Sequence, residues 1–250
     1  MIKFFRKIRQ NLLMENKTGK YFKYAIGEIL LVVIGILIAL QINNWNTERQ
    51  NENIRNSFLM KIDLELDYNE RRLNNLSEIY DGILEQNIKL YDTLLVKITP
   101  ENVEDYLKVN NFNASTLNLS SSTFEQMKST GNLHTLKTDT LLNAIETYYK
   151  LCEREDFYLR QINERITSNT LEEINHGLRK AQLDFYANGI DYTLKKNGWL
   201  LDSDSDEYAE FIRELLFTNY SIRDILNRID SIIDSSNNLK ELIKKELEFK

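Results

Sequence analysis

One apolar segment near the N-terminus constrains this chain more than any other feature. Residues 25–42 are apolar except for two polar positions, and a helix over them would extend about 27 Å, close to the roughly 30 Å hydrocarbon thickness of a bilayer. Tyr21, Tyr24 and Trp45 flank the segment where interfacial aromatic residues belong. We therefore predict a single membrane-spanning helix over residues 25–42.

A buried core helix and a removable signal peptide are the alternative interpretations of this segment. A signal peptide needs small residues at a cleavage site, and Ala39–Gln41, at the end of the apolar run, lacks that pattern. The leader before the run is also long for a signal peptide. Both observations favour a retained anchor.

The charges around the span predict its orientation. Basic residues precede the span and are opposed there only by Glu15; they are Lys3, Arg6, Lys7, Arg9, Lys17, Lys20 and Lys23. The positive-inside rule then places the N-terminus in the cytoplasm and the C-terminal part in the periplasm, with the span in the inner membrane. We predict a basic leader over 1–24, the span over 25–42 and an ectodomain over 43–250.

The leader and the ectodomain differ in charge and therefore in the partners they can bind. Apolar residues recur at helical spacing among the basic residues of the leader, which predicts an amphipathic helix on anionic membrane lipid, with a disordered basic tail as the alternative. The first 42 residues hold 7 of the 32 basic and 2 of the 38 acidic residues, which leaves 25 against 36 and a net charge of −11. Such an ectodomain is a poor ligand for nucleic acid.

Three residues of the span form a candidate face for helix association. Glu28, Gly35 and Ala39 are spaced 7 and 4 apart, so they share one face of the helix. Gly35 and Ala39 form a small-x-x-x-small pair that allows close approach, and a carboxyl group near hydrocarbon seeks a polar partner. The alternative is that Glu28 reaches the headgroups and that the small pair arose by chance.

The composition and periodicity of the rest of the chain predict an all-α fold. With 8 Gly and 1 Pro in 250 residues, the chain has few residues for tight chain reversals. A heptad seam after Trp45 predicts a long helix over 48–95, with a bend possible at Gly82. The seam residues are Leu59, Ile62, Leu66, Asn69, Leu73, Leu76, Tyr80, Ile83, Asn87, Leu90 and Leu94. Asn69 and Asn87 could fix its register against a partner helix of this or another chain.

Shorter signals divide the remainder of the ectodomain. Thr99 as a cap and Pro100 predict a short helix to about residue 109, followed by a loop over 110–122 and a helix over 123–130 that ends at Gly131.

Two more long helices follow. One is expected from a cap at Asp139 past Leu171, and the last from Ser205 or Asp206 to the charged end, with Asn-Gly turns at 188–189 and 197–198 between them. The expected architecture is a membrane helix followed by an up-and-down helical bundle.

Two motifs suggest metal binding, and neither is complete. Asp202–Asp206 has the alternating acidic spacing of a calcium loop, but Glu207 replaces the required Gly and Arg213 the closing Glu. Glu173 and His176 are spaced as in di-iron bundles, yet the other histidine, His134, lacks a matching Glu. We expect no metal or other cofactor.

Candidates for catalysis or ligand binding are also few. Cys152 lies on the apolar seam of the third long helix, which favours a buried hydrophobe over a nucleophile. No nucleophile elbow, Walker loop or zincin motif occurs, and we expect a protein without enzymatic activity. Aromatic residues could line a pocket, although core packing is the commoner role. They are Tyr148, Tyr149, Phe157, Tyr158, Phe185, Tyr186 and Tyr192.

Parts of the sequence resemble a known but uncharacterised family. The matching stretches are Met1–Arg9, Tyr24–Asn46 and, more loosely, Phe124–Leu136 with its Ser-Thr-Gly-Asn-Leu. They are similar to membrane-anchored proteins of the Bacteroidetes that share a domain of unknown function. The resemblance implies a membrane location and carries no catalytic residues.

The sequence therefore predicts a single-pass, N-in membrane protein whose ectodomain binds another protein or a second copy of itself. A ligand-binding or sensory ectodomain is the alternative, and it would have to signal through a partner, because about 24 leader residues are too few for a folded output domain.

Overall fold

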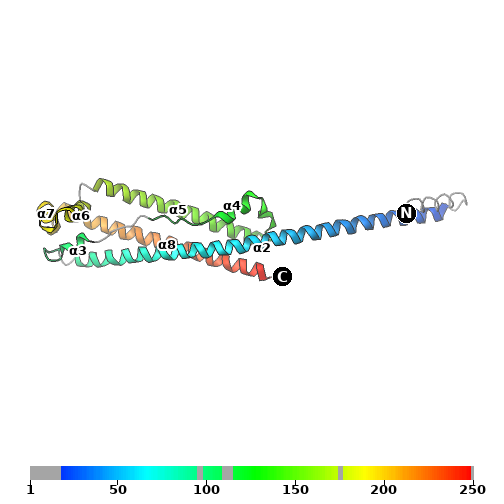
Figure 1. The fold of residues 1–250 in the computed structure, drawn as a ribbon, viewed down its shortest axis with the longest axis horizontal. Helices are drawn as coiled ribbons and strands as arrows, with labels where there is room; N and C mark the ends of the chain where they lie inside the picture. Colours follow the sequence, from blue (N-terminus) through cyan, green and yellow to red (C-terminus); the bar gives the residue numbers. More distant parts are fainter. Residues whose placement is uncertain (1–17, 95–97, 109–114, 174–176, 249–250) are drawn as a thin grey trace. The chain divides into compact units, whose positions relative to one another are not determined.

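The expected all-α fold is confirmed. The computed structural model describes residues 18–94, 98–108, 115–173 and 177–248, and within these ranges it contains helices and turns but no strand (Figure 1). The chain divides after Asn56 into two compact units, which we call the N-terminal unit and the bundle unit.

Helix α2, Thr18–Leu94, makes up the described part of the N-terminal unit and continues into the bundle unit. In the described part of the chain, α2 is the one helix long and apolar enough to cross a membrane, judged by length and composition, and its most apolar window is fully unburied. A core helix of a soluble protein would bury that window. The expected boundaries at 24/25 and 42/43 fall inside α2 and remain predictions.

Within the bundle unit, α2 buries the predicted seam. The buried members are Leu59, Ile62, Leu66, Asn69, Leu73, Leu76, Tyr80, Ile83, Asn87 and Leu90. The apolar members pack in one cluster with side chains of α5, Asp139–Glu173, and α8, Asp206–Glu248, except Leu90, which belongs to a second cluster. Each buried Leu or Ile contributes about 1.5–3 kcal/mol to folding. The seam is therefore satisfied within this chain, and α2 passes Gly82 without ending.

The directions of the three long helices follow from their contacts. Asn69 of α2 contacts Tyr148 of α5. Farther along each helix, Arg72 of α2 and Asn163 of α5 both bind carbonyls of segment 115–117, so α2 and α5 run parallel. Arg165 and Phe217 are in contact, as are Glu155 and Arg228, so α8 runs antiparallel to α5. In Figure 1, α2 and α5 run in the same direction and α8 runs in the opposite direction.

Because α2 and α5 are parallel, the chain must return along the bundle before α5 begins. The described part of this return is segment 115–121, which is neither helix nor strand and has Asn118 at a φ of 49°; we call it the strap. It leads into α4, Ser122–Ser129, and the 3₁₀ helix η1, Asn132–Thr135. Gly131 between them adopts the left-handed conformation, with φ of 72°, as predicted.

Short helices close the other end of the bundle around a second core. They are α3, Val103–Leu107, α6, Gly177–Asn188, α7, Ile190–Lys196, and the 3₁₀ helix η2, Gly198–Leu201. Their apolar side chains pack with Leu90 of α2 and with Tyr208, Phe211 and Leu215 of α8. Both predicted Asn-Gly turns lie between helices: Gly189, with φ of 82°, separates α6 from α7, and Asn197 separates α7 from η2, but α6 and α7 themselves were not predicted.

Two helices begin at other residues than the predicted caps, three positions later for α3 and one position earlier for α5. Asn102, rather than Thr99, precedes α3, because the Thr99 carbonyl accepts hydrogen bonds from the amides of Asn102 and Val103 and so closes a turn first. Thr138, rather than Asp139, caps α5, with its Oγ1 accepting from the Leu141 amide at 3.3 Å. Ser205 caps α8 as predicted, accepting from the Tyr208 amide at 3.2 Å.

Candidate functional site

The strap lies along α2 and is held there by polar side chains spaced four and three residues apart. Asn69 belongs to the buried seam, and Glu65 and Arg72, four positions before and three after it, lie beside it on one flank of α2. We call these three residues the strap clamp. The sequence analysis predicted neither the strap clamp nor its contacts with the strap. The spacing of the three residues by four and three, together with a later segment rich in Asn, Ser and Thr, was a signal that could have indicated them.

Glu65 is the most highly connected residue of the clamp. Its Oε1 accepts from the Tyr149 hydroxyl at 2.6 Å, and its Oε2 accepts from the Thr123 amide, Ser122 Oγ and Ser120 Oγ at 2.9, 3.0 and 3.1 Å. The carboxylate thus caps the N-terminus of α4, where the helix dipole favours negative charge. Burial alone would raise the pKa of Glu65, but these hydrogen bonds outweigh it and lower the pKa. Glu65 therefore stays ionised at neutral pH.

Asn69 and Arg72 bind the backbone of the strap. Asn69 Nδ2 donates to the Ser120 carbonyl at 2.9 Å and to the Tyr148 hydroxyl at 3.2 Å, while the Ser120 amide donates to Asn69 Oδ1 at 2.7 Å. Arg72 donates to the carbonyls of Leu117 at 3.2 Å and Thr116 at 3.0 Å. A buried seam Asn that fully engages its amide in this way links α2 to the strap and α5 together.

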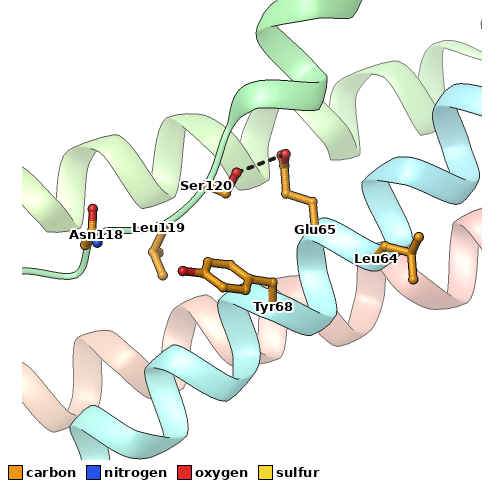
Figure 2. Close-up of a pocket in the computed structure, with 6 residues that line it drawn as sticks. All are labelled: Leu64, Glu65, Tyr68, Asn118, Leu119 and Ser120. Atoms are coloured by element: carbon orange, nitrogen blue, oxygen red, sulfur yellow. Dashed lines mark hydrogen bonds between the residues drawn. The ribbon is translucent and has the colours of Figure 1, made fainter.

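A hollow of about 520 Å³ lies between α2 and the strap and is open to solvent. We call it the Leu64 groove, lined by Leu64, Glu65, Tyr68, Asn118, Leu119 and Ser120. Figure 2 shows Tyr68 reaching from α2 toward Leu119 of the strap, with Glu65 bonded to Ser120 beside them.

Exposed apolar side chains continue the groove along α2. Met60, Leu64 and Tyr68 are 53%, 66% and 53% exposed and are spaced four residues apart, so they form one stripe on the helix. A stripe that faces away from the buried seam is not needed for packing within the bundle. The groove and stripe together form a candidate binding surface on the described part of the bundle unit.

A second polar cluster joins α5 to α8. Glu155, which lies on the buried side of α5, is 3% exposed and pairs with Arg228 at 2.6 Å and Arg154 at 2.5 Å. Arg228 also pairs with Asp224 at 2.8 Å and lies over the Tyr158 ring at 4.5 Å. Its hydrogen bond to Asp224, followed by that to Glu155, raises the pKa of Arg228 despite partial burial. The charged groups of this cluster are therefore paired with one another, and the Glu155–Arg228 pair joins α5 to α8.

The remaining candidates from the sequence do not converge on a site. Burial raises the pKa of Cys152 to about 12, which keeps the thiol protonated and unreactive. Asp202 folds back on itself, accepting from the Asp204 amide at 3.1 Å, at the start of α8. Among the described residues, no group of three or more His, Cys, Asp or Glu is placed to hold a metal. His176 lies outside the described residues, and His134 Nδ1 contacts the Gly131 carbonyl at 2.7 Å.

The aromatic residues divide among separate places. Tyr148 and Tyr149 belong to the main core, where Tyr149 stacks on Phe124 with ring centroids 4.5 Å apart. Phe157 and Tyr158 are exposed on α5, and the others lie on α6 and α7. They therefore do not line one pocket.

The residues of the proposed association face lie in the N-terminal unit. A Cβ on Gly35 would meet nothing within 4 Å in this single chain, so its small size is not required by intramolecular packing. Ala39 is exposed and Glu28 half-buried. Association through this face remains a prediction, as does a register role for Asn87, which is buried.

Fold and groove together define a helical bundle that continues from a long apolar helix and holds the strap against its surface. Residues 28–212 match a family described as "Family of unknown function (DUF6090)", and the chain belongs to this family. A search of curated proteins and a search of solved structures each gave no match.

Proposed function

We propose that this chain is a single-pass protein of the bacterial inner membrane whose acidic bundle works in the periplasm by binding another protein or a second copy of itself. The resemblance of its anchor to proteins of the Bacteroidetes suggests that source, and the basic leader supports the N-in orientation. Membrane lipid is the further partner, through the span and leader.

The Leu64 groove is the observation that carries the binding role. It combines an open hollow with apolar side chains that the bundle leaves uncovered. A non-enzymatic role is supported by the state of the buried polar groups: Glu65 is committed to four hydrogen bonds, and Glu155 to Arg228 and Arg154. The Cys152 thiol is buried and protonated.

Crosslinking of the full chain in native membranes, followed by mass spectrometry of the products, tests this proposal. We expect discrete products in which this chain is joined to one other protein or to itself. A chain that stays monomeric with crosslinkers of several lengths and chemistries would contradict it. A matched control replaces the bundle by an unrelated soluble domain after the same anchor. It should lose the products that form through the bundle, whereas a self-adduct formed through the span should persist.

A further inference from the structure

We draw no further inference here: the strongest candidate, the Leu64 groove with its exposed apolar stripe on α2, is lined by the ionised Glu65 and bordered on the same helix by both acidic and basic residues, so nothing in the structure shows what covers it.

Discussion

Glu65 is a buried carboxylate that accepts hydrogen bonds from backbone and hydroxyl donors of three other elements. The amide of Thr123 and the hydroxyls of Ser120 and Ser122 come from the strap and α4, and the Tyr149 hydroxyl comes from α5. Removing this carboxylate would leave each of these donors without its partner, and buried unsatisfied donors lower the free energy of unfolding.

Glu65→Gln tests that role at constant size. The amide group of Gln cannot accept at both former oxygens, so at least one buried donor loses its partner, and we expect a loss of about 1–3 kcal/mol of unfolding free energy. Urea unfolding of the full chain in detergent, followed by circular dichroism, measures it. Glu125→Gln, on the exposed side of α4, should change the value by less than about 0.5 kcal/mol. Equal effects of the two substitutions would show that the buried bonds contribute nothing specific.

The lowered pKa of Glu65 also predicts a dependence on pH. A carboxyl group whose folded pKa lies below its ordinary value of 4.5 contributes stability that is present above 4.5 and is lost as the pH falls through the folded pKa. The difference in stability between wild type and Glu65→Gln should therefore be constant at neutral pH and shrink as the solution is acidified below 4.5. A difference that grows on acidification would mean that the Glu65 pKa is raised.

Among the secondary-structure elements, Gly82 and Gly131 have similarly open surroundings but different backbone conformations. Gly131 has φ of 72° between α4 and η1, whereas Gly82 lies within α2, and a Cβ at either would meet nothing within 4 Å. Any effect of alanine at these positions must then come from the backbone.

We expect opposite signs for the two alanine substitutions. Gly131→Ala should destabilise the protein by about 1–2 kcal/mol, because a Cβ strains the left-handed conformation. Gly82→Ala should stabilise it by about 0.5–1 kcal/mol, because Gly loses more conformational freedom in a helix. Thermal unfolding of the two variants beside the wild type gives both values. A stabilising Gly131→Ala would contradict the observed φ.

Elements with one dominant period could be predicted from the sequence, and the strap could not. The α2 seam and the start of α8 follow from steps of 3 and 4 and from a capping Ser, which are local properties. The strap is held along α2 by Glu65, Asn69 and Arg72, and its bonds to Glu65 and Asn69 join positions 51 and 55 residues apart. Such contacts are visible only once the parallel packing of α2 and α5 is known. The groove depends on the strap and was hidden for the same reason.

For the whole molecule, the orientation in the membrane is the first property to test. The excess of basic residues before the span predicts that the C-terminal end lies outside the cytoplasm. A reporter enzyme that is active only in the periplasm, fused after Lys250, should be active, and a cytoplasmic reporter at the same place should be silent. The reverse pattern would overturn the orientation, the location and the proposed site of action together.

Association through the span is a second property of the assembled molecule. Gly35→Ile places a branched side chain where two helices would approach, so it should weaken self-association of the isolated span in a membrane two-hybrid assay. Glu28→Gln keeps hydrogen bonding and should be milder than Glu28→Leu. Leu37→Ile, on the opposite face of the helix, is the control. Disruption by Leu37→Ile with no effect of Gly35→Ile would place the contact on a different face.

The pairing of Lys240 with Glu70 has a consequence for how the chain is made. These partners lie 170 residues apart, and α5 and α8 must both be present before the seam of α2 is covered. At about 5–20 residues per second, roughly 10–35 s pass on the ribosome between Glu70 and Lys240. The long amphipathic face of α2 emerges early and stays uncovered for that time, so a holdase chaperone has both a target and an interval in which to act.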